Sequence, residues 1–152
     1  MINYYNKIDN VKKAEKNPMQ WKMSAIKVIK VDNEHFELLC AVCGKTAVKF
    51  IIDFPIVGDS KDLIYSGITH SKAIGLKHKN KIFQLLTDKK ISELHNYLIK
   101  YCSFEDGIDA YCPQCDKIYC REHYNVKIVW DNGFYDYAIG KCPEGHERII
   151  DD

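Results

Sequence analysis

Eight cysteine and histidine residues occur in four closely spaced pairs, and this arrangement constrains the fold of the chain more than any other feature. The pairs are Cys40/Cys43, Cys112/Cys115, Cys120/His123 and Cys142/His146. A structural Zn²⁺ ion takes four ligands in a tetrahedron, so eight ligands fill two closed sites with none left over. Mixed thiolate and imidazole ligands favour zinc over other metals. The sequence therefore predicts a fold built around two Zn²⁺ ions.

The spacing within each pair has a physical basis. In Cys-x-x-Cys a tight turn aims both sulfurs at one point, and Gly44 after the first pair permits the positive φ that such turns commonly need. In Cys142-Pro-Glu-Gly-His146 the glycine directly before the histidine predicts a tight reversal. The spacing of Cys120 and His123 suits the first turn of a short helix.

Size and cysteine use indicate a small protein of a reducing compartment. The 152 residues suffice for one domain, or for two small domains that share a core. The polar start, Met1 to Lys16, lacks the apolar stretch of a signal peptide, and no apolar run is long enough to cross a bilayer. Seven cysteines without an export signal are more typical of metal ligands than of disulfides. We expect a cytoplasmic protein without a membrane partner.

Charge is distributed unevenly along a chain whose net charge is +1. Residues 1–30 carry +5 and residues 61–100 carry +5, whereas residues 101–152 hold five bases and eleven acids, a net charge of −6. Solvated faces are the simplest explanation, and a partner site is the alternative. Twenty lysines against two arginines argue mildly against a nucleic-acid surface, because arginine supplies most bidentate contacts to bases and phosphates.

Periodicity predicts an α+β protein with three parts. Residues 1–22 form a leader, residues 23–109 form a strand-rich unit with the first zinc knuckle and a helical segment, and residues 110–152 form a Cys/His module packed against that knuckle. Predicted strands cover 26–30, 35–39 and 47–53, and a hairpin pairs 63–65 with 71–76. Apolar residues at helical spacing cover 82–101, with a break at Thr87-Asp88 where Asp88 caps the second helix.

The order CxxC, CxxC, CxxH, CxxxH resembles that of RING-like and FYVE-like zinc fingers, which are cross-braced and, in the second case, treble-clef folds. This resemblance implies a treble-clef-like module at the C-terminal end, in which the first and third pairs share one ion and the second and fourth pairs share the other. It assigns Cys40, Cys43, Cys120 and His123 to one ion, and Cys112, Cys115, Cys142 and His146 to the other. Residues 44–111, between the first two pairs, form a much longer insertion than those families contain.

The activities of those families do not follow from the resemblance. The basic cluster with which FYVE-like domains bind phosphoinositide is absent, and so is the Cys-x-His pair of a RING. The segments Cys40 to Val48, Tyr111 to Tyr124 and Gly140 to Asp152 are also similar to a family of small uncharacterised bacterial proteins with the pattern CxxC…CPxC-x4-CxxH…CPxGH. That similarity supports the eight ligands and supplies no activity.

The remaining cysteine, histidine and aromatic residues are predicted to be structural. Cys102 is expected to be a small buried apolar group. Four histidines lack ligand spacing and are expected to be surface or locally hydrogen-bonded: His35, His70, His78 and His95. Trp130 and the run Phe134 to Tyr137 are expected to pack between the zinc knuckles, with an aromatic recognition surface as the alternative.

Three function classes remain after this survey. The leading hypothesis is a non-enzymatic zinc protein that binds another protein, because closed metal sites use every recognisable constellation of reactive residues. The second is nucleic-acid binding through the lysine-rich stretches 7–30 and 72–90. The third is a zinc-dependent or thiol enzyme, which would require a site with only three protein ligands, or a redox-active Cys112-Pro-Gln-Cys115.

Overall fold

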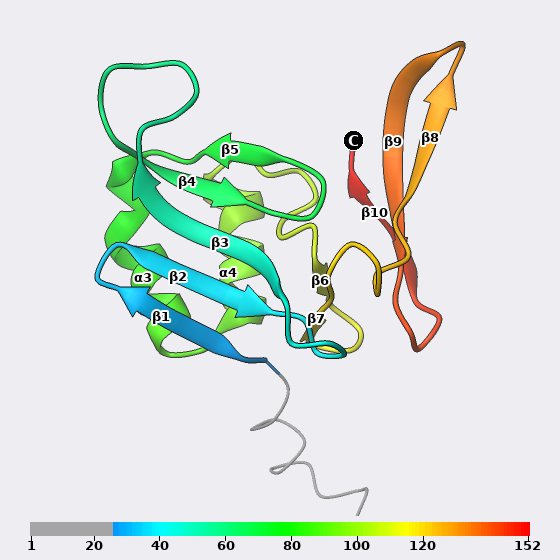
Figure 1. The fold of residues 1–152 in the computed structure, drawn as a ribbon, viewed down its shortest axis with the longest axis horizontal. Coiled ribbons are helices and arrows are strands. Elements are labelled where there is room, and N and C mark those ends of the chain that lie inside the picture. Colours follow the sequence, from blue (N-terminus) through cyan, green and yellow to red (C-terminus); the bar gives the residue numbers. More distant parts are fainter. Residues whose placement is uncertain (1–25) are drawn as a thin grey trace, which may run out of the picture.

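The computed structural model describes residues 26–152, so the predicted leader, residues 1–22, lies outside the described residues. The chain forms a five-stranded sheet backed by two helices, followed by a strand-rich C-terminal part at its side (Figure 1). The mixed helix and strand content confirms the α+β expectation in this coarse form. No helix in the described part is long and apolar enough to cross a membrane.

The first sheet is an antiparallel meander of five sequential strands. They are β1 (Val28–Asp32), β2 (His35–Leu39), β3 (Thr46–Asp53), β4 (Asp62–Ser66) and β5 (Ser71–Ala73). The strands predicted at 35–39 and 47–53 are confirmed, as is the hairpin between β4 and β5. The second arm of that hairpin ends earlier than predicted, because Gly75 has a φ of 110° and a 3-10 turn, η1 (Leu76–His78), follows it.

Helices α3 (Lys79–Thr87) and α4 (Ile91–Tyr101) cover one face of this sheet and close the main core (Figure 1). Alternate strand residues point toward the helices, so the sheet supplies every second side chain to the core. The largest fully buried side chains of this core are Tyr65, Tyr111, Phe50, Leu38, Leu63, Ile82, Leu86, Ile91, Leu94, Leu98 and Ile108.

The break between the helices is confirmed, but the predicted cap is wrong. Asp88 ends α3 and its carboxylate accepts a hydrogen bond from Gln84 Nε2 at 2.8 Å. Lys89 then adopts a φ of 55°, and Lys90 precedes α4 without a capping side-chain bond. The chain needs this left-handed residue to reverse, which moves the start of the second helix beyond the reach of Asp88.

The C-terminal part contains two small sheets and no helix between residues 110 and 152. Strands β6 (Tyr111–Cys112) and β7 (Lys117–Ile118) form a short hairpin, and β8 (Lys127–Asp131), β9 (Phe134–Lys141) and β10 (Glu147–Asp151) form a sheet in the order β10-β9-β8. A second, smaller core holds this sheet together, and it contains two of the predicted ligands together with buried Tyr119, Tyr124, Ala138 and Ile150.

The short helix expected at Cys120 is a single turn. Tyr124 N–H donates to Cys120 O at 2.8 Å, as in a helix, but Asn125 adopts a φ of 46° and ends the turn. The helix that would complete a treble clef is therefore not formed after this pair.

Candidate metal centres

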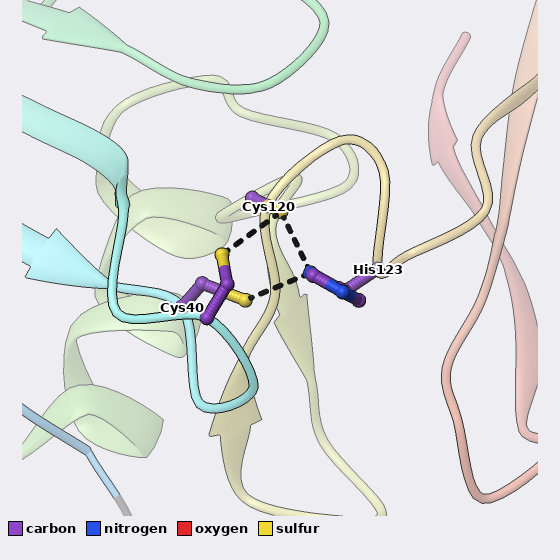
Figure 2. A group of neighbouring side chains, drawn as sticks. Cys40, Cys120 and His123 are labelled. Atoms are coloured by element: carbon purple, nitrogen blue, oxygen red, sulfur yellow. Dashed lines mark hydrogen bonds between the residues drawn. The ribbon is translucent and has the colours of Figure 1, made fainter.

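The first cluster joins two segments that are far apart in the sequence. Cys40 and Cys43 lie in the turn between β2 and β3, and Cys120 and His123 lie in the turn after β7. Figure 2 shows Cys40, Cys120 and His123 pointing toward a common centre from these two turns. The four ligand atoms all lie within 4.8 Å of one another. The first and third pairs are thus brought together.

The second cluster brings the second and fourth pairs together. Cys112 and Cys115 lie in the β6–β7 hairpin, and Cys142 and His146 lie in the turn between β9 and β10. Here, too, the three sulfurs and one imidazole nitrogen lie within 4.8 Å of one another. Within residues 26–152 these two clusters are the groups of three or more cysteine, histidine or acidic side chains that are close enough together to hold a metal ion.

The distances between ligand atoms match the edges of a tetrahedron around a metal ion. With Zn–S bonds of about 2.3 Å and Zn–N bonds of about 2.0–2.1 Å, a regular tetrahedron has S–S edges of about 3.8 Å and S–N edges of about 3.6 Å. The sulfurs of Cys43 and Cys120 lie 3.8 Å apart, and those of Cys115 and Cys142 lie 3.6 Å apart. These separations exclude a disulfide, whose sulfurs are about 2.0 Å apart.

The distances from sulfur to the imidazole nitrogens complete both tetrahedra. His123 Nδ1 lies 3.7 Å from Cys40 Sγ and 3.2 Å from Cys120 Sγ. His146 Nδ1 lies 3.7, 3.2 and 3.3 Å from the sulfurs of the second cluster. In both clusters Nδ1 is the ring nitrogen that faces the thiols. Each cluster therefore offers three sulfurs and one nitrogen at the spacing that a single tetrahedral ion requires.

The backbone around each pair is shaped for ligand turns. Gly44 has a φ of 74° and its N–H donates to Cys40 O at 3.0 Å, which closes the first turn as the sequence predicts. Gly145 has a φ of 91°, and the N–H of His146 donates to Cys142 Sγ at 3.3 Å. Left-handed backbone of this kind favours glycine, so both turns depend on the residue type at these positions.

Thiol pKa values show how strongly each cluster resists carrying several negative charges. Burial and the neighbouring Cys40 raise the pKa of Cys120, and burial raises the pKa of Cys115 to about 12. For Cys40 burial also acts to raise the pKa, but backbone N–H groups, those of Cys120 and Cys43 foremost, lower it to about 6. In the first cluster the Cys40 thiolate is therefore stabilised, while Cys120 is driven toward the neutral thiol. A divalent cation at the centre would allow all three thiolates to coexist.

The two clusters belong to different cores. Cys40 and Cys120 are part of the main core, whereas Cys112 and Cys142 are part of the smaller C-terminal core. The first cluster is accompanied by a direct backbone bond, from Ala41 N–H to Ile118 O at 2.7 Å. The first cluster therefore joins the C-terminal part to the main sheet, and the second lies within the C-terminal part itself.

The cysteine and the four histidines outside the clusters are predicted to be structural, and the structure shows where each of them lies. Cys102 is only 7% exposed and packs in the main core, which confirms the expectation, and burial raises its pKa. His95 is buried with Nδ1 accepting the Ile108 N–H at 3.0 Å, and His78 Nδ1 lies 2.7 Å from Tyr97 OH. His70 lies near Asp109, and His35 lies 3.5 Å from Glu37. His70, His78 and His95 thus have polar partners, as expected, whereas the buried Nε2 of His35 makes no hydrogen bond.

The aromatic residues of the β8–β9 hairpin contradict the packing prediction. Trp130 is 62% exposed, Phe134 76% and Tyr135 43%. The small core is filled instead by Tyr119 and Tyr124, which contact each other edge to face with ring centroids 5.7 Å apart. The hairpin extends away from the knuckles, so its aromatic side chains have nothing to pack against there.

Sequence reasoning missed two polar residues that hold the two halves together. Asp109 is fully buried and accepts hydrogen bonds from Tyr65 OH and from both the N–H and the hydroxyl of Thr69. Arg148 on β10 donates to the carbonyl oxygens of Tyr111, Asp106 and Ile108, at 3.0, 3.1 and 2.7 Å. Nothing in the local sequence marks either residue, because their partners lie about 40 positions away.

Residues 27–152 match a protein family described as "Domain of unknown function (DUF8328)". The match covers both clusters and every strand and helix that the structure describes. Neither a curated protein nor a solved structure shows a significant match to the chain. The family description states no metal and no activity, so the chemistry must be inferred from the clusters themselves.

Proposed function

The chain belongs to the family described as a domain of unknown function (DUF8328), and from this premise we propose that it is a zinc protein with two structural sites that acts by binding another protein. The observation that carries the proposal is the pair of Cys3His clusters with ligand atoms at tetrahedral spacing. Three thiolates and an imidazole favour Zn²⁺ over oxygen-seeking ions such as Mg²⁺ and Ca²⁺.

The proposed sites are structural and not catalytic. A catalytic zinc ion keeps one position open for water or substrate, whereas a structural ion has four protein ligands. Each cluster supplies four. The alternation of ligand pairs supports a cross-brace like that of RING-like and FYVE-like fingers, and the hairpin-and-turn ligand segments support a treble-clef-like module that lacks its helix. Reduced thiols are required for both sites, so we place the protein in a reducing compartment, the cytoplasm.

Protein binding is proposed because the fold presents exposed apolar groups and because residues 26–152 contain no recognisable catalytic set. Large apolar side chains are exposed on the β8–β9 hairpin, on β1 and in the loop after β3. Contiguous exposed apolar side chains often mark interaction surfaces. Nucleic-acid binding is disfavoured because the aromatic hairpin lies in the acidic end of the chain, where phosphates would be repelled.

Metal analysis of the purified full chain tests the zinc sites. We expect two zinc ions per chain by elemental analysis after expression in medium without added zinc, and cooperative unfolding when a strong chelator removes them. Cobalt substitution should give the intense visible absorption of tetrahedral thiolate sites. A chain that folds fully with no bound metal, or that takes up one ion only, would refute the two-site proposal.

A further inference from the structure

The three-stranded C-terminal sheet has a face that packs on the small core and a hairpin end that is exposed. On β9 Ala138 and Gly140 share one face while Tyr137 and Ile139 share the other, and the register shift between Val129 and Trp130 interrupts this alternation before Tyr135. The first face is buried: Ala138 is inaccessible, and a Cβ added at Gly140 would lie 2.6 Å from the Tyr124 ring. Tyr137 and Ile139 therefore face away from the core.

Register places Trp130 and Tyr135 together on one face at the exposed end of the hairpin. Tyr135 pairs with Trp130 on β8, and Ile139 pairs with Ile149 on β10. Residues directly opposite each other in an antiparallel pair lie on the same face. Trp130 and Tyr135 contact each other edge to face at 6.2 Å, and Ile149 is 43% exposed. Because Tyr137 pairs with Val129, which directly precedes Trp130 on β8, Tyr135 lies on the opposite face from Tyr137 and on the same side as Asp151, the partner of Ala138. We define the open face as the exposed surface that Trp130 and Tyr135 form at the end of the hairpin.

The edge beside this face is also open. β8 is the terminal strand of its sheet, and β9 is its only strand partner among residues 26–152. Figure 1 shows the β8–β9 hairpin at the side of the molecule away from the five-stranded sheet and extending beyond the end of β10. An unpaired edge strand presents a row of N–H and C=O groups that an extended peptide can use as a template.

The surroundings of the open face are acidic. Residues 127–152 contain six acids and three bases, a net charge of −3. One of the three bases, Arg148, directs its guanidinium at buried carbonyl oxygens. Tyr135 OH donates to Asp151 Oδ2 at 2.6 Å, so the open face continues directly to the carboxylates of β10.

A pocket lies next to those carboxylates. It has a volume of about 280 Å³ between β10 and the loop after α4, and Asp106, Asp151 and Asp152 are among its lining residues. Lys72 also lines it, but its ammonium group donates to Ser103 O at 2.8 Å and lies over the Phe104 ring. A cationic side chain from a partner would find several carboxylates there.

We propose that the open face and the β8 edge bind an extended segment of a partner protein in which apolar residues alternate with lysine or arginine. The segment would pair with β8, place its apolar side chains over Trp130 and Tyr135, and direct basic side chains toward Asp151 and its neighbours. Tryptophan and tyrosine are the side chains that contribute most at such interfaces. This inference rests on the proposed protein-binding function, and it specifies the surface and the partner.

Selection from a random twelve-residue peptide library displayed on phage tests the proposal, with the zinc-loaded full chain as target. Enriched peptides should alternate apolar residues with lysine or arginine, and their affinity should fall as salt rises. The double variant Trp130→Ser/Tyr135→Ser should lose at least tenfold in affinity. The matched variant Ile29→Ser/Val31→Ser, which changes similarly exposed residues on β1, should bind normally.

Amide hydrogen exchange with the best peptide reports strand addition directly, because amides of residues 127–131 should gain protection. Enrichment of acidic peptides, no enrichment, or equal binding by the double variant would overturn the proposal. Two other results would also overturn the proposal, because the open face would then bind a different partner. They are dimerisation of the wild-type chain and its binding of single-stranded oligo-dT, if either is lost in the double variant. Zinc content distinguishes failure of the peptide-binding inference from failure of the proposed zinc sites. If every variant holds two ions and no peptide binds, only the peptide-binding inference is refuted. If the wild-type chain holds no zinc, the proposed metal sites are refuted.

Discussion

Replacing Cys43 with alanine separates the metal-ligand role of a cysteine from its packing role. Cys43 is exposed, so loss of its side chain removes little buried surface, and substitutions at exposed sites usually change stability by less than about 0.5 kcal/mol. If Cys43 is a zinc ligand, the loss is much larger. A structural zinc site contributes about 10–16 kcal/mol through four ligands, or roughly 3–4 kcal/mol per ligand.

Cys102 provides the matched control, because it is buried and has no place in either cluster. Cys102→Ala removes one buried sulfur and should cost about 1 kcal/mol, as for the loss of a small buried group. For a chain of this size these values correspond to a fall in Tm of roughly 6–16 °C for Cys43→Ala and roughly 2–4 °C for Cys102→Ala. The exposed cysteine is thus predicted to matter more than the buried one.

Thermal unfolding followed by circular dichroism, together with elemental analysis, measures both quantities. Cys102→Ala should retain two zinc ions, and Cys43→Ala should lose one or bind it weakly. In the presence of a strong chelator the difference between wild type and Cys43→Ala should disappear, because neither protein then has the ion. Our reasoning fails if Cys43→Ala melts with the wild type, or if the order of the two variants is reversed.

Three further predictions concern individual buried side chains and close contacts. Arg148→Met should destabilise the protein by about 2 kcal/mol or more in thermal unfolding, because it removes the guanidinium hydrogen bonds to the carbonyl oxygens of Tyr111, Asp106 and Ile108. His95 should remain neutral at pH 5.5 in an NMR titration of its ring, since burial, with a smaller contribution from Arg148, lowers its pKa to about 4. Because the unfolded chain takes up that proton near pH 6.5 and the folded chain near pH 4, this residue's contribution to stability is complete above pH 6.5 and is lost as pH falls to 4. Gly140→Ala should cost about 1–3 kcal/mol in denaturant unfolding, because its Cβ would lie 2.6 Å from the Tyr124 ring, and wild-type stability would contradict the close approach.

The features that sequence predicted are those encoded by local spacing. Ligand pairs, the glycine after Cys43 and the strand at 35–39 are each recognisable within a few residues, and the structure contains them. The eight residues that the structure gathers into two clusters are the same eight that the pairs contain. Their grouping could be anticipated from a resemblance in ligand order, although the long insertion 44–111 has no counterpart in it.

The features that sequence missed depend on contacts between distant segments. Arg148 binds carbonyl groups that precede it by about 40 residues, and Asp109 binds Tyr65 across a similar separation. An arginine in a strand and an aspartate in a loop are unremarkable until the fold brings these partners to them. The aromatic hairpin was misjudged for the same reason, since composition alone cannot say that Tyr119 and Tyr124 fill the small core and leave Trp130 outside.

The two clusters join different segments of the chain, and this difference connects metal binding with the proposed peptide binding at the open face. The first cluster spans sequence separations of 77 and 83 residues, and the second spans 27 to 34. Loop closure explains little of the difference, because its entropic cost grows so slowly that these lengths differ by only about 1 kcal/mol.

The two clusters differ more clearly in the size of the apolar core that surrounds each of them. The first cluster lies at the margin of a large apolar core, whereas the second lies within a core of six buried residues. A unit as small as residues 110–152 seldom folds without a metal or a disulfide. Its cluster includes Cys142 and His146, which directly follow β9 and directly precede β10. The second ion would therefore fix the register of the two strands that carry Tyr135 and Ile149. Removal of that ion should abolish peptide binding at the open face, while loss of the first ion should leave the face intact and weaken its attachment to the main sheet.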